Sequence, residues 1–383
     1  MRILWSSNAV WAHTGYGIQA KYLLPRFQAL GHEVAQFAWY GLQGAAIQAA
    51  GMPIYPMGND RWGSDIIGGH AAHFRADVVL SLMDIWVLPP DYRERVGVPW
   101  VCWFPVDHEP APWLVVERAK TADYPVVYSR FGEQMMANEG LACEYIPHGV
   151  DCEVYAPGDK AEARRRLGLP ADGFVCAMVA ANKGVPSRKA IAEQLMAFAL
   201  FAKERPDLDP HVYLHMDTST AQGGLNIVSL VRNLGIADRV RYVDQYRNVI
   251  GLAEEYLAHV YNAADVLLAA TMSEGFGIPI IEAQACGCPV LTTNATSMPE
   301  LTFNGIATEP AQPFWTPMDS WIAMPSVANI SAALHEVAEW GDAERADRAQ
   351  FGIEQVRQNY DWDVCVERYW VPFLERVQRD IAA

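Results

Sequence analysis

The chain has 383 residues, more than one hydrophobic core usually holds, so its length predicts two domains. Half of the residues (51%) are hydrophobic and 19% are charged, which is typical of a globular protein and excludes a disordered chain. No stretch approaches the ~20 apolar residues of a membrane span, and a formal charge of −16 disfavours non-specific attraction to nucleic acid or anionic lipid.

The first residues, Met1–Trp5, run directly into a strand pattern, so we expect no signal peptide. The seven cysteines include no Cys-x-x-Cys pair, and their odd number favours reduced thiols. Together these features predict a cytoplasmic protein, and they leave its oligomeric state open.

Short apolar runs alternate with helical segments along the chain, a pattern that predicts α/β domains built on parallel sheets. In the first half, strands are expected near residues 3–6, 34–39, 78–82, 101–106, 126–128 and 144–146. The clearest helix is Ile18–Leu30, which ends at Gly31. In the second half, strands are expected near residues 174–179, 212–216, 240–243, 266–270 and 290–292.

A turn-rich segment, Tyr155–Asp159, predicts the boundary between the two halves. We therefore expect one domain over residues 1–155 and a second over residues 156–355. A final helix within 356–383 carries apolar residues at helical spacing and is expected to cross back to the first domain. The aromatic, proline-containing region Thr302–Pro325 is expected to be irregular, and either a functional loop or a packing patch.

The most informative pattern lies near residue 270, where a strand, a glycine loop and a helix follow one another. Val266–Ala270 predicts a buried parallel strand, and Pro279 suits the first turn of a helix. Between them, Gly275 and Gly277 predict a loop whose backbone N–H groups can meet an anion at the helix N-terminus.

Two carboxylates, Glu274 and Glu282, flank this loop and are expected to face the same pocket, because helical side chains lean toward the N-terminus. Both would repel a phosphate, so they suit sugar and ribose hydroxyl groups instead. The pattern indicates a nucleotide-sugar site; the alternative is a pair of surface glutamates.

Ser187, Arg188 and Lys189 are expected to open a helix, with Ser187 as its N-cap. Two cations in a first turn oppose the helix dipole, which makes sense if a diphosphate binds there. The alternative is that both side chains reach into water.

Asp107 and His108 follow a buried strand of the first domain, so they are expected at the sheet edge where ligands bind. Either side chain suits the orientation of an acceptor hydroxyl or a donor sugar, and His108 can exchange a proton near neutral pH. An ordinary hydrogen-bonded loop histidine is the alternative.

Gly15 and Gly17 match the Gly-x-Gly pattern of dinucleotide binders, but they lie well after the preceding strand, and the second strand ends without an acid for the ribose of NAD. A dehydrogenase is therefore disfavoured. A loop that approaches a phosphate or sugar with its backbone is expected instead.

Together these residues resemble the retaining glycosyltransferases of family 4, which have the GT-B architecture of two Rossmann-like domains facing across a cleft. The most specific match is the run from Glu274 to Glu282, followed by Pro299–Leu301. Weaker matches are Ile146–Asp151 and Tyr261–Asp265. The resemblance covers nearly the whole chain, more loosely in the first domain.

The resemblance implies an N-terminal acceptor domain and a C-terminal donor domain. It implies that Glu282 binds the nucleotide ribose, and that Glu274 acts with the loop to hold the donor sugar. The loop residues are Gly275, Phe276, Gly277 and Ile278. Lys189 takes the place of the family's diphosphate-binding lysine, with either Arg188 or Lys183 as its partner. Gly15 and Gly17 match the glycine loop near the diphosphate, and His108 matches a histidine near the transferred sugar.

We therefore expect transfer of a hexose from a nucleoside diphosphate, UDP or GDP, with retention at the anomeric carbon and without a metal or other cofactor. The expected catalytic residues are Asp107, His108, Lys189 and Glu274. No nucleophile for a double displacement is evident, so a same-face reaction is expected. A sugar-nucleotide epimerase, a phosphorylase and a non-catalytic sugar-binding module remain the alternatives.

The sequence does not identify the acceptor, which can be a glycan, a small molecule or a lipid. Aromatic residues are plentiful in the loops of the first domain and can stack on a sugar or a base: Trp11, Tyr16, Trp62, Trp86 and Trp113. A hydroxymethylated base in phage-type modified DNA is a further option, which the acidic net charge and the lack of a basic stripe disfavour.

Overall fold

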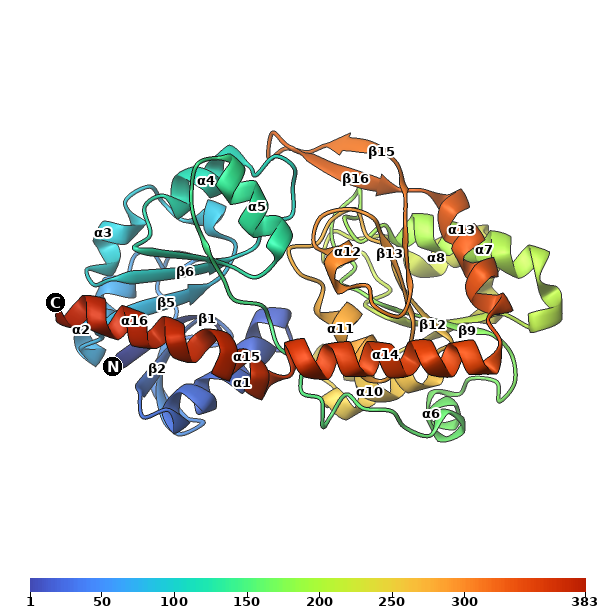
Figure 1. The fold of residues 1–383 in the computed structure, drawn as a ribbon, viewed down its shortest axis with the longest axis horizontal. Coiled ribbons are helices and arrows are strands. Elements are labelled where there is room, and N and C mark those ends of the chain that lie inside the picture. The colour runs from blue at the N-terminus through green and yellow to red at the C-terminus, as the bar shows by residue number, and fades with distance from the viewer. The chain divides into compact units, whose positions relative to one another are not determined.

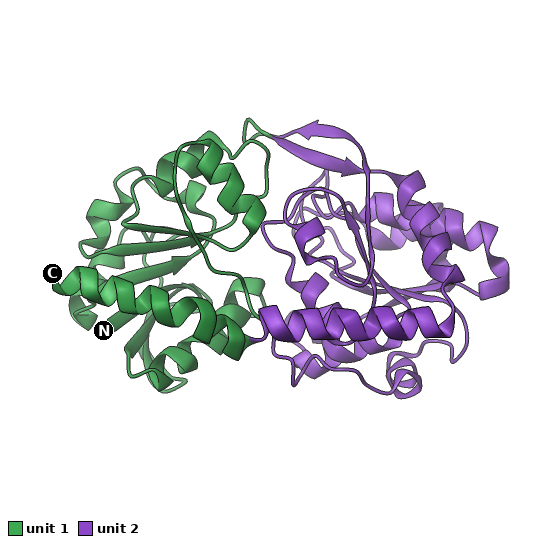
Figure 2. Ribbon diagram, viewed as in Figure 1, with its two compact units in different colours: residues 1–149, 317–320, 362–383 green, residues 150–316, 321–361 purple.

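The computed structural model describes residues 1–383 and divides them into two compact units (Figure 2). Unit 1 comprises Met1–Gly149, Pro317–Ser320 and Trp362–Ala383, and unit 2 comprises Val150–Thr316 and Trp321–Asp361. These boundaries differ from the predicted ones near residues 155 and 355. The reason is a backbone pairing: the Val150 N–H donates to the Tyr360 carbonyl at 2.8 Å, and Val150 bridges Asp361, so both segments belong to unit 2.

Unit 1 is built on an eight-stranded sheet in the order β3-β4-β2-β1-β5-β6-β7-β8. All neighbours are parallel except β3 and β4, which form an antiparallel edge that the sequence did not predict. The strands are β1 (Arg2–Asn8), β2 (Glu33–Tyr40), β3 (Ile47–Ala49), β4 (Met52–Pro56), β5 (Val78–Leu82), β6 (Trp100–Phe104), β7 (Tyr124–Val127) and β8 (Glu144–Tyr145).

Helices connect these strands, and the end of the chain adds a further helical segment (Figure 1). The connecting helices are α1 (Gly15–Ala29), α2 (Ile67–Phe74), the short η1 (Ile85–Val87), α3 (Tyr92–Val96), α4 (Trp113–Ala119) and α5 (Arg130–Asn138). The terminal segment contains α15 (Trp362–Cys365), the π-helical turn η4 (Val366–Trp370) and α16 (Val371–Ala382). Every residue of β5 and β6 is buried, as expected for parallel strands covered on both faces.

Unit 2 has a six-stranded parallel sheet in the order β11-β10-β9-β12-β13-β14. Its strands are β9 (Val175–Val179), β10 (His211–His215), β11 (Val240–Tyr242), β12 (Val266–Ala269), β13 (Val290–Thr293) and β14 (Ile306–Thr308). Its helices and 3-10 turns are α6 (Lys160–Leu167), α7 (Ile191–Glu204), η2 (Pro206–Leu208), α8 (Ile227–Asn233), η3 (Ala237–Arg239), α9 (Gln245–Ile250), α10 (Glu254–Ala263), α11 (Ile278–Ala285), α12 (Met298–Leu301), α13 (Val327–Glu339) and α14 (Asp342–Tyr360). Helices α7 and α13 pack side by side, as Figure 1 shows.

Both sheets have the doubly wound strand order, in which the chain leaves the first central strand in one direction and later returns to its other side. The direction reverses between β1 and β5 in unit 1, and between β9 and β12 in unit 2. Ligands of such sheets bind beyond the carboxyl ends of the strands at this reversal. The predicted α/β class and the two parallel sheets are thereby confirmed. No helix in either unit has the length and apolar character that crossing a membrane requires.

The region Thr302–Pro325, predicted to be irregular, is largely regular. It contains β14 and an antiparallel hairpin of β15 (Pro310–Trp315) and β16 (Trp321–Pro325). Prolines normally argue against strands but are tolerated at sheet edges, and a two-stranded hairpin consists only of edges. Ile322 and its neighbours pack on Ala190 and Met272, so the hairpin supports the loops of unit 2 that follow β9 and β12.

The predicted glycine loop at Gly15 and Gly17 is instead the first turn of α1. Thr14 caps this helix by accepting a hydrogen bond from the Gly17 N–H at 3.1 Å, so that amide is not free to meet a ligand. A side chain at position 17 would place its Cβ 2.2 Å from the Ala12 carbonyl oxygen and 2.9 Å from that of Ala9. Gly17 therefore serves the close approach of α1 to the turn before it.

We predict that Gly17→Ala destabilises the protein although alanine is the better helix former. The added Cβ meets backbone oxygens that cannot move aside, and overpacking of this kind costs about 1–3 kcal/mol. The matched control is Gly69→Ala in the interior of α2, where the Cβ has room and should stabilise by about 0.5–1 kcal/mol. Thermal unfolding of the two variants should shift in opposite directions; equal shifts would contradict the packing role.

Candidate functional site

Two polar segments of unit 2 meet at the point where the strand order reverses. One segment follows β9 and carries Lys183, Arg188 and Lys189, and the other follows β12 and carries Glu274. Because β9 and β12 are neighbours in the sheet, their carboxyl ends bring the two segments together. The Met272 N–H donates to the Arg188 carbonyl at 2.8 Å, which joins the segments through their backbones.

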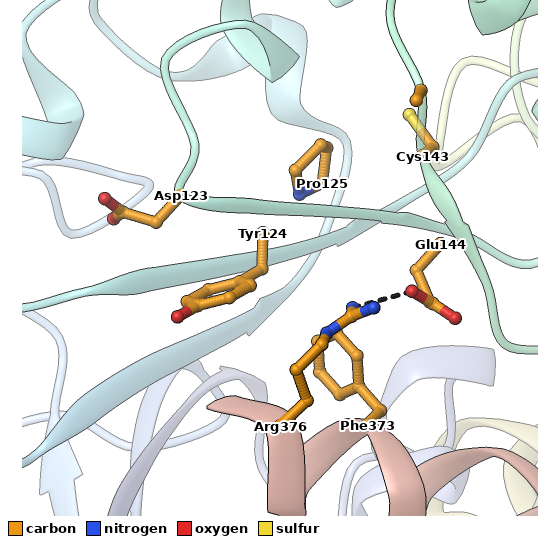
Figure 3. Close-up of a pocket in the computed structure, with 8 residues that line it drawn as sticks. Asp123, Tyr124, Pro125, Cys143, Glu144, Phe373 and Arg376 are labelled. Carbon is orange, nitrogen blue, oxygen red and sulfur yellow. Dashed lines mark hydrogen bonds and ion pairs between the residues drawn. The ribbon is translucent and has the colours of Figure 1, made fainter. Parts of the chain in front are cut away.

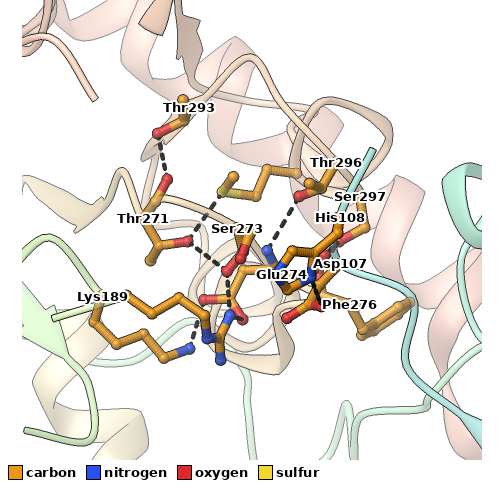
Figure 4. Close-up of polar contacts among 12 residues, drawn as sticks. Asp107, His108, Lys189, Thr271, Ser273, Glu274, Phe276, Thr293, Thr296 and Ser297 are labelled. Carbon is orange, nitrogen blue, oxygen red and sulfur yellow. Dashed lines mark hydrogen bonds and ion pairs between the residues drawn. The ribbon is translucent and has the colours of Figure 1, made fainter. Parts of the chain in front are cut away.

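The centre of the site is the Glu274 carboxylate, which two cations contact (Figure 4). Lys189 Nζ donates to Glu274 Oε1 at 2.5 Å, and Arg188 Nη1 lies 3.4 Å from Glu274 Oε2. Arg188 also donates to the Ser273 carbonyl. Glu274 is buried, whereas Arg188 and Lys189 are partly exposed, so the cations lie between the carboxylate and solvent.

Burial alone would raise the pKa of Glu274, but the positive charges of Lys189 and Arg188 outweigh it and lower the pKa below its ordinary value. Glu274 is therefore ionised at neutral pH and can accept hydrogen bonds from hydroxyl groups. The two cations remain accessible from one side, where they suit an anionic ligand.

The loop Gly275–Gly277 is held by two side chains that follow β13 and that the sequence analysis did not select. Ser297 Oγ donates to the carbonyls of Glu274 and Phe276 at 2.9 and 2.7 Å, and Thr296 Oγ1 accepts from the Glu274 N–H at 3.1 Å (Figure 4). With its carbonyls held in this way, the loop leads into α11, which begins at Ile278. The N–H groups of Gly275 and Gly277 donate to no protein acceptor.

The second predicted carboxylate, Glu282, lies in α11 and is buried. Tyr261 donates its hydroxyl proton to Glu282 Oε2 at 2.7 Å. Burial raises the pKa of Glu282 to about 7, although the hydroxyls of Tyr261 and Tyr155 partly oppose the shift. The two glutamates thus differ in charge state: Glu274 is compensated by cations, and Glu282 titrates near neutral pH.

The predicted helix start at Ser187 is wrong, because α7 begins at Ile191 after Ala190, which has a left-handed backbone (φ 47°). Arg188 and Lys189 therefore lie in the loop before the helix, and the argument from the helix dipole does not apply to them. Gln194 holds this loop by donating to the Lys189 carbonyl at 2.8 Å and accepting from the Ala270 N–H at 3.0 Å.

The two candidates for the partner of Lys189 occupy different places. Arg188 contacts the same carboxylate as Lys189, whereas Lys183 is exposed and its backbone pairs with Gly223. No hydrogen bond or ion pair joins the Lys183 side chain to Glu274. The geometry therefore favours Arg188 as the second cation of this site.

In unit 1, Asp107 and His108 follow β6 and form a hydrogen-bonded pair. His108 Nδ1 lies 2.6 Å from Asp107 Oδ1, and His108 is buried. When Nδ1–H donates to the carboxylate, Nε2 carries the lone pair and can accept a proton. His148 differs from this pair: its ring packs against Trp103 and Tyr128, and burial lowers its pKa to about 3.

Sequence reasoning gave no site role to five residues that hold the site through hydrogen bonds, although Tyr261 lay in one of the weaker family matches: Tyr155, Gln194, Tyr261, Thr296 and Ser297. Thr296 and Ser297 follow β13, the neighbour of β12 in the sheet, and polar residues after a predicted strand were the available signal. Tyr155 and Gln194 gave no signal, because their contacts depend on the packing of distant elements.

A small cavity of about 260 Å³ lies elsewhere in unit 1 (Figure 3). It is at the amino ends of β7 and β8, next to α16, and thus at the sheet edge opposite to ligand sites. Its polar groups are paired, with Arg376 on Glu144 at 2.6 Å and Tyr124 on Asp380 at 3.2 Å. No group of three or more His, Cys, Asp or Glu side chains in the chain is placed to hold a metal ion.

Residues 178–316 match the model of a family described as "Glycosyl transferases group 1". The matched segment lies within unit 2 and spans less than half of the chain. It includes Lys189, Glu274 and Glu282, so the resemblance inferred from the motif is confirmed there.

Proteins that are similar to this chain in sequence are also named glycosyltransferases. The chain is 34% identical over 146 residues to a D-inositol 3-phosphate glycosyltransferase of Actinosynnema mirum, covering 37% of this chain and 33% of that protein. It is 31% identical over 234 residues to the protein of that name from Mycobacteroides abscessus, covering 60% and 46%. The chain thus spans less than half the length of these relatives.

Solved glycosyltransferase structures share the fold of the whole chain. A sucrose-phosphate synthase from Thermosynechococcus elongatus superposes with a TM-score of 0.77 at 18% identity, covering 100% of both chains. WaaG, a glycosyltransferase involved in lipopolysaccharide biosynthesis, gives 0.68 at 14% identity, covering 96% of this chain and 98% of its own. At this level of identity the likeness establishes the GT-B fold.

We predict that Glu282 makes the stability of unit 2 fall as the pH rises. Its folded pKa of about 7 lies above the ordinary value of 4.5, so between these values the folded protein retains a proton that the unfolded chain has lost. The contribution is complete below pH 4.5 and disappears as the pH passes 7.

The measurement is the melting temperature of the wild type and Glu282→Gln between pH 5 and pH 8. The isosteric amide does not titrate, so the variant should gain stability relative to the wild type as the pH rises. Glu336→Gln, at an exposed position of α13, is the control and should follow the wild type. Parallel curves for Glu282→Gln and the wild type would contradict the assignment.

Proposed function

We propose that the protein is a retaining glycosyltransferase that moves a hexose from a nucleoside-diphosphate sugar to a hydroxyl group of an acceptor. The single observation that carries the proposal is the Glu274 carboxylate with Lys189 and Arg188 against it, at the strand reversal of a group 1 glycosyltransferase domain. The names of the relatives, all glycosyltransferases, support the reaction class but not a particular acceptor.

The donor diphosphate is proposed to bind the partly exposed Lys189 and Arg188, which keep their contacts with Glu274. Glu274, held ionised by these cations, accepts hydrogen bonds from hydroxyls of the donor sugar. The unpaired amides of Gly275 and Gly277 at the start of α11 add neutral donors to the same ligand.

Glu282 is proposed to bind the ribose hydroxyls. An ionised carboxylate accepts a hydrogen bond from a hydroxyl at each of its two oxygens, whereas a protonated one is also a donor. The pKa of Glu282 is about 7 in the free protein. Hydrogen bonds from the bound donor should favour the ionised carboxylate, so donor binding should release the Glu282 proton. Donor affinity is therefore expected to rise between pH 6 and pH 8. UDP and GDP are the proposed nucleotides, and no metal is assigned to the reaction.

The proposed reaction takes place on one face of the sugar. The bond from the anomeric carbon to the diphosphate oxygen breaks, the bond to the acceptor oxygen forms, and the acceptor proton passes to the leaving diphosphate. Lys189 and Arg188 stabilise the negative charge that develops on that diphosphate, which is the electrostatic role that cations play in such sites. The configuration of the anomeric carbon is then retained.

The test is a thermal-shift panel of UDP, GDP and ADP sugars, followed by mass spectrometry of the best donor with pools of acceptors. Anomeric coupling constants in the NMR spectrum of the product give its configuration. A product of inverted configuration would refute retention. Conversion of the donor without an acceptor would indicate an epimerase, and release of sugar phosphate a phosphorylase.

We predict that Lys189→Ala and Arg188→Ala each weaken donor use by about tenfold or more, since a charge-assisted contact to phosphate is worth about 1.5–3 kcal/mol. Lys183→Ala should have little effect if Arg188 is the partner of Lys189. Lys203→Ala, at an exposed position near the end of α7, is the control. Wild-type kcat/KM in both Lys189→Ala and Arg188→Ala would rule out this donor site.

We predict a different effect for His108. If its Nε2 orients an acceptor or sugar hydroxyl, His108→Ala should lower turnover by about 10²-fold, the loss expected when a reacting group is misplaced. The donor-induced thermal shift should stay unchanged, because the diphosphate contacts belong to unit 2. Asp107→Asn should give a smaller loss, since it disturbs only the tautomer of His108. Loss of the thermal shift in His108→Ala would argue for a donor-binding role instead.

A further inference from the structure

Four exposed aromatic side chains of unit 1 follow four neighbouring strands of its sheet. Tyr40 ends β2, Trp11 follows β1, Trp86 lies in η1 after β5, and Trp113 opens α4 after β6. Their exposed fractions are 55%, 41%, 44% and 68%, large values for side chains of this size. In the sheet these strands lie in the order β2-β1-β5-β6, so the residues form a row that we call the aromatic band.

The members of the aromatic band lie on segments that contact one another in two pairs. Trp11 donates its indole N–H to the Gly41 carbonyl at 3.1 Å, directly after Tyr40, and the Ala9 N–H donates to the Tyr40 carbonyl at 2.8 Å. Helix α4, which begins at Trp113, packs against η1, which contains Trp86. Because β1 and β5 are hydrogen-bonded neighbours, the two pairs lie side by side along the carboxyl edge of the sheet.

The position of the band distinguishes it from aromatic residues exposed singly, which are common on protein surfaces. Trp11 and Trp86 lie on either side of the reversal of strand order between β1 and β5, where sheets of this kind bind ligands. Trp113 closes the connection that carries Asp107 and His108. The same edge thus holds both flat apolar surfaces and the one aligned carboxylate–histidine pair of unit 1.

The charges of this edge are one-sided. The four connections after β1, β2, β5 and β6 are residues 9–14, 41–46, 83–91 and 105–112, and none of them contains a lysine or an arginine. They contain four carboxylates, Asp84, Asp91, Asp107 and Glu109, of which Asp91 is paired with Arg95 of α3 at 2.9 Å. The connection after β4 carries Arg61, but its guanidinium lies over the Trp62 ring. A ligand of the four connections after β1, β2, β5 and β6 would therefore meet aromatic faces and hydrogen-bond acceptors, and no lysine or arginine within them to bind a phosphate.

We propose that the aromatic band binds an uncharged oligosaccharide as the acceptor of the reaction, a specification that rests on the proposed function. Sugar rings offer apolar faces that stack on indole and phenol rings, and hydroxyls that donate to carboxylates. Adjacent strands are about 4.8 Å apart, so the band extends over about 14 Å along the edge, wider than one sugar ring. His108 lies in the connection beside Trp113, where an acceptor hydroxyl would be oriented.

The aromatic residues alone would also suit the bases of a nucleic acid, but stacking proteins of that kind combine aromatic side chains with a positively charged groove that follows the phosphates. Phosphate contacts by Lys and Arg supply most of the non-specific affinity for DNA. The absence of both residue types from these connections, together with the four carboxylates, favours the uncharged ligand over DNA and over phosphorylated sugars.

The test measures binding of acceptor candidates to the full chain without a donor, by saturation-transfer NMR and titration calorimetry. The probes are short neutral oligosaccharides of glucose, mannose, galactose or N-acetylglucosamine, the same compounds bearing a phosphate, and a hydroxymethylated DNA duplex. The variants are Trp11→Ala and Trp113→Ala, both at exposed positions, and the control is Phe351→Ala in α14, where the side chain is about as exposed. The donor-induced thermal shift is measured on every variant as a test of folding and of the donor site.

We expect a neutral oligosaccharide to bind the wild type, and each tryptophan variant to raise its Kd by about tenfold, the fold-change that corresponds to loss of one stacking contact. Phe351→Ala should bind like the wild type, and all variants should keep their donor-induced shift. The proposal is overturned if no neutral oligosaccharide binds, if the phosphorylated compounds or the DNA bind more tightly, or if the tryptophan variants bind normally. A failure of the proposed function would appear separately, as the absence of any nucleotide sugar that shifts the melting temperature or is consumed.

Discussion

The buried carboxylate of Glu274 is the constraint around which the candidate site is arranged. A carboxylate in this position is costly unless cations compensate it, and removing one partner of a buried pair typically costs about 3–5 kcal/mol. Lys189 and Arg188 supply the compensation, and both precede the first turn of α7. Their positions in turn depend on the left-handed Ala190, on Gln194, and on the backbone hydrogen bond between Met272 and Arg188. The Glu274 carboxylate is thus compensated before any ligand arrives, and a diphosphate would give the two cations a second anionic partner.

The second carboxylate shows how environment separates two residues of the same type. Glu282 lies on the same strand–loop–helix unit as Glu274 but faces tyrosine hydroxyls instead of cations. Burial keeps the pKa of Glu282 raised although the tyrosine hydroxyls partly lower it, whereas the two cations hold Glu274 ionised. The two glutamates therefore suit different parts of one ligand, the more permanent charge beside the cations and the titrating group beside the tyrosines.

Much of the fold and the centre of the site could be predicted from the sequence, because they depend on local patterns. The apolar runs gave the central strands of both sheets, and the glycines and proline between Glu274 and Glu282 gave the strand, loop and helix around the site. Predictions failed where the local structure depends on packing against residues that are distant in the sequence. Ser187 is a good cap by residue type, yet α7 begins at Ile191, and Gly17 is required by two carbonyl oxygens of the preceding turn. Ser297 and Tyr155 act through contacts that only the folded chain creates.

The hairpin of β15 and β16 determines how the molecule can be divided. Its strands belong to unit 2, but its tip, Pro317–Ser320, belongs to unit 1, where Met318 packs on the hydrophobic core and Ser320 donates to the Pro110 carbonyl. A fragment cut at Val150 and Asp361 would carry this tip away from the core it completes and expose Met318 to water. Unit 1 would lose the same four residues, which no fragment with a single start and end can restore. Each unit has its own sheet, yet unit 1 needs the continuous chain to be complete.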